Sequence, residues 1–220
     1  MHQPLLPFLI ERLISFFAVV PIAIAMLRFK HLSTPLKIIL SFISFSFALI
    51  IVNVVLSYYD INNLVIFHFY AIFEFALVLW YFSYYTDGFL KKAIIPLVVL
   101  FTVWSVFNFF FVQTGLQLNT YTRPVESLII IFYCLSFFNK QTQTDSDLRW
   151  GSVGANWVTV ALTEFYTCSF FMFIFANYFL KKGDPSSHYF WKGYDVILFI
   201  ENVLFAIGFY KTRAAIIKKT

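Results

Sequence analysis

Residues 62–82 read NNLVIFHFYAIFEFALVLWYF, an apolar and aromatic run that contains one histidine, His68, and one carboxylate, Glu74. About 20 such residues, each rising about 1.5 Å, form an α-helix long enough to cross about 30 Å of hydrocarbon. A carboxylate in the middle of such a helix is costly unless it faces another polar group or internal water. The stretch therefore predicts a membrane helix whose Glu74 faces the interior of a helical bundle.

The rest of the 220-residue chain has the same character, with 60% hydrophobic, 22% aromatic and 12% charged residues. Soluble domains carry about 25% charged residues, and an outer-membrane barrel would show alternating segments of about 10 residues. The pattern predicts an all-α, polytopic membrane protein that forms one domain over residues 1–220. The net charge of +5 comes from basic residues at helix ends, so it does not indicate a nucleic-acid partner.

Short polar breaks divide the chain into seven predicted transmembrane helices. They cover residues 6–27, 36–58, 64–85, 93–112, 122–138, 155–180 and 193–210. Arg28 and Lys30 directly follow the first run, and no Lys or Arg precedes Glu11. We therefore expect the first run to be a membrane anchor and not a cleaved signal peptide.

Basic residues are divided unevenly between the two ends of these helices. One end carries eleven of the 16: Arg28, Lys30, Lys37, Lys91, Lys92, Lys140, Arg149, Lys211, Arg213, Lys218 and Lys219. The positive-inside rule places this end in the cytoplasm, with the N-terminus outside and the C-terminus inside.

The three hairpins that follow the first helix share a pattern, which suggests an internal repeat of the kind found in transporters. In each hairpin, an asparagine lies near the outer end of the helix that runs outward. A glutamate follows in the helix that returns toward the cytoplasm. The pairs are Asn53 with Glu74, Asn108 with Glu126, and Asn177 with Glu201. Two residue types alone make a weak motif, so a chance origin of the pattern stays open.

Polar residues inside the predicted helices mark the candidate site. At about 1.5 Å per residue, Glu74, Glu164 and Glu201 converge on the bilayer midplane, whereas Glu126 and Arg123 lie nearer the outer surface. We predict an acid-rich pocket that opens outward, with Tyr70 on the same helical face as Glu74. The expected lining is Glu74, Glu164, Glu201, Glu126, His68, Arg123, Tyr70, Asn53 and Asn108.

The same residues also admit structural roles. Arg123 and Glu126, three residues apart, could form an ion pair at the membrane interface. His68 could bond to a neighbouring helix, and Glu74, Glu164 and Glu201 could form a hydrogen-bonded network without a ligand.

An acid-rich cavity favours a proton or a small cationic ligand over an anion. The sequence has no H-x-x-x-H or H-E-x-x-H pair, nucleophile elbow, P-loop or dinucleotide motif, and no GxxxG pair. It therefore identifies no cofactor, leaves metal binding open and gives little support to an enzyme.

Four stretches carry a resemblance: HLSTPLKIILSF (31–42), INNLVIFHFYAIFEF (61–75), RPVESLIIIFY (123–133) and WKGYDVILFIENVLFAIGF (191–209). With them the chain resembles a group of uncharacterised bacterial multi-pass membrane proteins, and some comparable seven-helix modules serve as sensory inputs. The resemblance implies no activity, and a sensory role would require a separate signalling partner.

Three functional hypotheses follow. The first is a receptor-like module that binds a small cationic or apolar ligand from outside and signals to a cytoplasmic or membrane partner. The second is a proton- or cation-coupled transporter that uses Glu74, Glu164 and Glu201 as a relay. The third is an intramembrane enzyme acting on a lipid or isoprenoid, with a glutamic acid as general acid.

Overall fold

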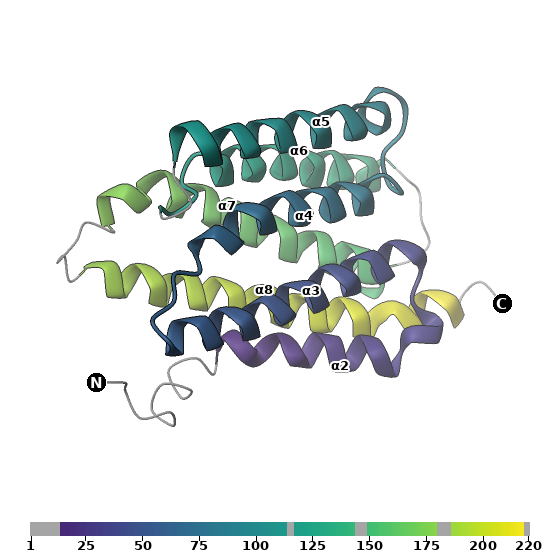
Figure 1. Ribbon diagram of the computed structural model, residues 1–220. Helices are drawn as coiled ribbons and strands as arrows, with labels where there is room; N and C mark the ends of the chain where they lie inside the picture. The colour runs from purple at the N-terminus through teal and green to yellow at the C-terminus, as the bar shows by residue number, and fades with distance from the viewer. Residues whose placement is uncertain (1–13, 114–116, 144–148, 180–185, 218–220) are drawn as a thin grey trace.

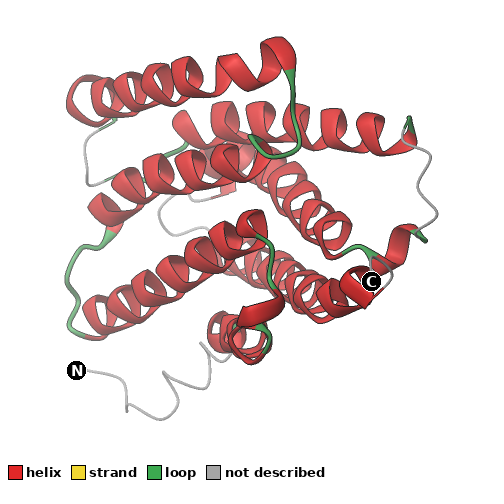
Figure 2. Ribbon diagram, turned by 90° about the vertical axis from the view of Figure 1, so that its right-hand side faces the viewer, coloured by secondary structure: helices red, strands yellow, loops and turns green. Residues whose placement is uncertain are grey.

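A computed structural model describes residues 14–113, 117–143, 149–179 and 186–217 (Figure 1). These residues form helices and connecting loops and contain no strand (Figure 2), which confirms the predicted all-α fold. The α-helices are α2 (Val19–Leu27), α3 (Thr34–Tyr58), α4 (Leu64–Phe82), α5 (Gly88–Phe107), α6 (Thr122–Thr142), α7 (Gly154–Phe179) and α8 (Ser186–Ile217). Three short 3₁₀ helices, η1 (Ser15–Ala18), η2 (Phe29–His31) and η4 (Trp150–Ser152), and one π-helical turn, η3 (Asn108–Val112), complete the described elements.

The helix boundaries follow the apolar runs closely at some ends and pass beyond them at others. The predicted helices 36–58 and 155–180 agree with α3 and α7 to within two residues at each end. By contrast, α5 begins at Gly88 and not at 93, and α8 extends beyond 193–210 at both ends. The backbone hydrogen bonds of a helix do not require apolar side chains. A helix can therefore continue through charged residues, beyond the edge of an apolar run. Of the predicted first helix, residues 6–13 lie outside the described residues.

Five of the described helical segments are long and apolar enough to cross a membrane. They are Thr34–Tyr58, Leu64–Phe82, Gly88–Val112, Gly154–Phe179 and Tyr189–Thr212. The segment Ser15–Leu27 is shorter, and α6 carries Arg123 and Glu126 in its first turns and Lys140 in its last. The helices fit a multi-pass membrane protein, while seven crossings remain a prediction.

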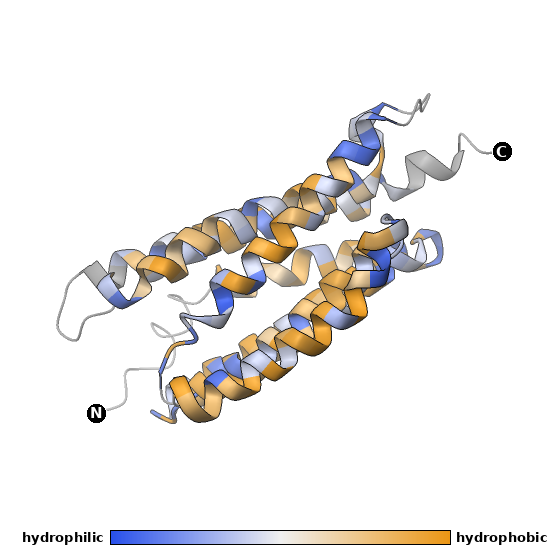
Figure 3. Ribbon diagram, turned by 90° about the horizontal axis from the view of Figure 1, so that it is seen from above, coloured by the Kyte–Doolittle hydropathy of each residue, from blue (hydrophilic) through white to orange (hydrophobic). Residues whose placement is uncertain are grey.

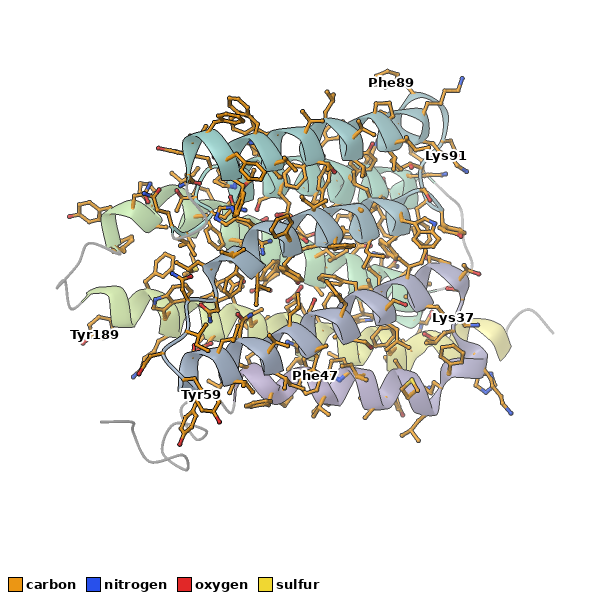
Figure 4. All side chains as sticks on the ribbon, in the orientation of Figure 1. Lys37, Phe47, Tyr59, Phe89, Lys91 and Tyr189 are labelled. Carbon is orange, nitrogen blue, oxygen red and sulfur yellow. The ribbon has the colours of Figure 1, made fainter. Side chains whose placement is uncertain are left out.

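The helices run side by side, and successive ones point in opposite directions (Figure 1). Going around the bundle, α2 packs on α8, α8 on α7, α7 on α6, α6 on α4, and α4 on α3. The remaining long helix, α5, lies at one edge and packs mainly on α4 (Figure 1). Figure 4 shows Lys37 and Lys91 at one end of the bundle, and Tyr59 and Tyr189 at the other.

The exposed surface is far more apolar than that of a soluble protein, although the core is apolar as well. Apolar side chains face outward, as with Leu100 and Phe111, which are 66% and 77% exposed. Several charged or ionisable side chains are buried instead: His68, Glu74, Arg123, Glu126 and Glu201. Figure 3 shows hydrophobic residues along the helices and hydrophilic residues concentrated toward their ends. Such a surface is suited to contact with lipid.

Candidate functional site

The centre of the candidate site is Arg123, the second residue of α6. Its Nη1 atom donates to Oε2 of Glu74 on α4 and, over 3.0 Å, to Oε2 of Glu126 one turn along α6. All three side chains are buried, with exposures of 7% for Arg123, 1% for Glu74 and 0% for Glu126. One buried guanidinium therefore joins two carboxyl groups and links α4 to α6.

Aromatic side chains enclose this ion pair. The Tyr166 hydroxyl of α7 donates to Glu74 Oε1 over 2.8 Å. The Arg123 guanidinium carbon lies 5.2 Å from the ring centre of Tyr70 and 5.9 Å from that of Phe173. Within about 6 Å, the negative face of an aromatic ring attracts a cation, and the attraction strengthens away from water. The aromatic residues therefore help to keep the guanidinium charge stable inside the bundle.

Two further contacts connect the site to the remaining core helices. The Tyr70 hydroxyl and the Ser46 Oγ atom of α3 form a hydrogen bond of 2.7 Å. The ring of Phe173 lies edge-on to that of Tyr194 on α8, with 6.2 Å between the ring centres. Contacts that begin at Arg123 thus reach α3, α4, α7 and α8.

Several buried carboxylates are incompletely paired. Among the residues that the structure describes, Glu126 Oε1, Glu164 Oε2 and Glu201 Oε1 have no hydrogen-bond partner. Glu201 is buried on α8 and lies close enough to Glu74 and Glu164 to interact with both electrostatically. Glu164 is half-buried on α7. Arg123 therefore pairs with Glu74 and Glu126, whereas Glu201 interacts with other carboxyl groups, Glu74 and Glu164.

The structure adds partners that the sequence does not indicate. Arg123 and Glu126 form the ion pair that their spacing allows, both side chains are buried, and Arg123 also bonds to Glu74 on another helix. Glu74, which lies at the predicted depth of Glu164 and Glu201, has Arg123 and Tyr166 as its hydrogen-bond partners. Helical spacing gives the face of one helix and not the neighbour that it meets.

A second polar network lies where α5 ends in the π-helical turn. The backbone N–H of Gln113 donates to the Asn108 carbonyl over 2.7 Å, which closes the turn. The Asn108 amide donates to Gln113 Oε1 over 3.2 Å, and the Gln113 amide donates to Thr120 Oγ1 over 2.7 Å. From α7, Asn177 donates to the same Thr120 oxygen over 3.2 Å. Two asparagines of the proposed repeat thus meet in one network.

Two other predicted residues face different neighbours. Asn53 accepts a hydrogen bond at its backbone carbonyl from the Asn63 side chain over 3.5 Å, and its own Oδ1 has no partner in the described chain. His68 Nε2 lies 3.1 Å from the carbonyl of Gln117, and its ring contacts Phe109. Asn53 therefore belongs to the α3–α4 connection, and His68 to the α5–α6 connection.

Further buried polar atoms in or near this network have no hydrogen-bond partner in the described chain. They include the Thr122 hydroxyl, one α-helical turn before Glu126, together with Asn119 Nδ2, Asn108 Oδ1 and His68 Nδ1. Proteins usually satisfy such atoms with internal water. The end of the bundle near the α5–α6 connection is therefore rich in buried polar atoms suited to internal water.

Sequence reasoning missed several residues of both clusters. Tyr166 and Phe173 follow Thr159 at steps of seven, so a stripe on one face of α7 was available as a signal. Gln113 and Thr120 lie in a break between apolar runs, where polar side chains are expected to be exposed to water. Nothing in the local pattern indicates that they are buried.

Two cavities of the bundle lie away from the residues of the candidate site. One, of about 350 Å³, is lined by α2 and α8, and another, of about 590 Å³, by α4 and α5. Neither lining includes a residue of the predicted site. Within the described ranges, no three His, Cys, Asp or Glu side chains are grouped so that they could hold a metal ion.

Comparison with known proteins assigns the chain to no family. No family model matches it, and no curated protein or solved structure is significantly similar to it. The chemistry of the buried carboxylates and Arg123 is therefore the basis for a functional conclusion.

Proposed function

We propose that the protein is a receptor-like module of the bacterial inner membrane that binds a proton or a small cation at its buried carboxylates. In this proposal the N-terminus is outside, the C-terminus is cytoplasmic, and the region of the buried carboxyl groups opens outward. The supporting observation is the imbalance of charge: Glu74, Glu126 and Glu201 are all buried, and Arg123, which pairs with Glu74 and Glu126, is the one buried arginine or lysine among the described residues.

The chemistry of the ligand follows from this imbalance. An ionised carboxylate that is buried without a counter-charge is very costly, because a low-dielectric interior cannot replace its hydration. Arg123 can balance only one of the three charges. A proton or a small cation would balance another, and an anion would increase the excess.

The packing supplies a way for binding to be sensed. A charge added at Glu126 changes the balance at Arg123 directly, and one added at Glu201 acts on its partner Glu74. Contacts that begin at Arg123 reach α3, α4, α7 and α8. A ligand shifts a conformational equilibrium by its difference in affinity for the two states. Here that difference would arise from how each helix arrangement pairs the acids, and a separate cytoplasmic or membrane partner would detect it.

Infrared spectroscopy of the purified protein in lipid nanodiscs tests this proposal. Without added multivalent cations at neutral pH, we expect the carbonyl stretch of at least one protonated carboxylic acid. Glu126→Gln or Glu201→Gln should remove it, whereas Asp87→Asn, at an exposed site, should leave it unchanged. If all carboxylates are ionised and no cation is bound, the proposal fails.

A coupled transporter is the second candidate, supported by the succession of acids through the bundle. Glu201 interacts electrostatically with Glu74 and with Glu164, so it could pass a proton or cation between them. In proteoliposomes with an imposed proton or cation gradient, we expect ion uptake to fall at least about tenfold in Glu201→Gln and to persist in Asp87→Asn. If the unaltered protein gives no ion flux, the transporter is excluded and the receptor-like module stands.

A further inference from the structure

A groove between α4 and α5 is lined by none of the candidate-site residues. Its volume of about 590 Å³ is within the range of ligand pockets, which is about 300–1,000 Å³. Trp80 on α4 and Ile95 and Val99 on α5 line it, and Trp80 and Ile95 are 52% and 75% exposed. In a membrane protein, such a groove opens toward lipid.

The groove has one cationic end. Lys91 and Lys92 line it in the first turns of α5, and both side chains are exposed. Val98 and Val99 lie seven residues further along the same helix, which is about 10 Å at 1.5 Å per residue. A ligand that lies along the groove therefore meets two positive charges at one end and an apolar wall over the rest of its length.

The surroundings favour a negative group beside these lysines. Lys91 lies at the same end of the bundle as Lys37 (Figure 4). Asp87, just before α5, forms an ion pair with Lys140 of α6. The hydrogen bond and charge of Lys140 lower the pKa of Asp87, with a smaller contribution from Lys91. Much of this carboxylate's charge is thus engaged by Lys140, which leaves positive charge available at the mouth of the groove.

We propose that this groove binds one anionic phospholipid taken from the bilayer. Its phosphate lies beside Lys91 and Lys92, and an acyl chain lies against Trp80, Ile95 and Val99. The ammonium of a zwitterionic phospholipid would be repelled by the lysines, so the site discriminates by headgroup charge. An anionic lipid at this end also agrees with a cytoplasmic position of the lysines, since the cytoplasmic leaflet is negatively charged.

Native mass spectrometry of the full chain released from detergent tests the site. We expect phosphatidylglycerol to bind about 10- to 30-fold more tightly than phosphatidylcholine, since each lysine near a membrane surface contributes about 1 kcal/mol. Lys91→Gln with Lys92→Gln should abolish this preference. The matched control, Lys30→Gln with Lys37→Gln, removes the same charge at the same end of the bundle and should retain it.

A variant of the apolar wall tests the other half of the site. Ile95→Ser, at a side chain that is 75% exposed and not part of the core, should weaken the binding of both lipids about equally. Soluble glycerol 3-phosphate should not displace phosphatidylglycerol, because it lacks the acyl chain. Equal affinity for the two lipids, or a preference unchanged in the Lys91 and Lys92 double variant, would overturn the proposal.

Discussion

Replacing Arg123 with glutamine is expected to lower the free energy of unfolding by about 3–5 kcal/mol, the cost of removing one partner from a buried ion pair. The substitution leaves Glu74 and Glu126 facing each other inside the bundle, and glutamine cannot supply a charge to either. It also removes the cation from beside Tyr70 and Phe173. Thermal or chemical unfolding of the purified protein in a mild detergent measures the loss.

Two further variants separate charge balance from a general effect of losing an arginine. Arg28→Gln removes an arginine that donates to the Tyr210 carbonyl over 2.6 Å at the edge of the bundle, and it should cost far less. Glu74→Gln combined with Arg123→Gln should restore part of the stability lost in Arg123→Gln, because it removes one uncompensated charge. A double-mutant cycle for contacting residues typically gives 0.5–3 kcal/mol of coupling. Strict additivity would show that the pair does not act as a unit.

The fold class was predictable because the apolar runs are long and the charges that interrupt them are clustered. The same patterns identified Glu74, Glu126 and Arg123 as residues that need partners inside the bundle, since charge within an apolar helix is costly. The spacing of Arg123 and Glu126 also indicated that they could touch. These inferences depend on one helix at a time, and local periodicity is reliable at that scale.

Contacts between helices were not predictable in the same way. The hydrogen bond from Tyr166 to Glu74 joins residues 92 positions apart, and no pattern in α4 indicates which helix supplies the partner. The burial of Gln113 and Thr120 depends on how α5, α6 and α7 meet at one end of the bundle. The polar residues that build the site also lower the hydropathy of α6, so hydropathy alone does not mark this helix as a membrane span.

The close approach of α7 and α8 is another contact that the sequence pattern does not predict. It depends on one glycine from each helix and not on a motif within either helix. A Cβ atom added at Gly208 would lie 2.9 Å from Val158 Cγ2 and 3.0 Å from the Gly154 carbonyl oxygen. A Cβ atom at Gly154 would collide with the Gly208 carbonyl oxygen and lie 3.0 Å from Thr212 Oγ1. Backbone oxygens cannot move aside as the end of a flexible side chain can.

Gly154→Ala is therefore expected to lower the free energy of unfolding by about 3 kcal/mol, the upper end of the usual cost of overpacking. Gly208→Ala should be comparably harmful, because the added methyl group meets both a side chain and the backbone of α7. Either change should separate the helices and disturb Tyr166 on α7 and Glu201 on α8. Unfolding in detergent measures the stability, and the infrared carboxylic-acid band reports the site.

Gly193→Ala is the matched control, because it lies on α8 like Gly208 but has no atom within 4 Å of the added Cβ. There alanine should be neutral or stabilising by about 0.5–1 kcal/mol, since it restricts the unfolded chain and favours the helix. If Gly154→Ala and Gly208→Ala unfold like Gly193→Ala, α7 and α8 do not pack through this contact. A loss confined to the two contacting glycines would show that backbone-to-backbone packing holds the α7 and α8 sides of the site together.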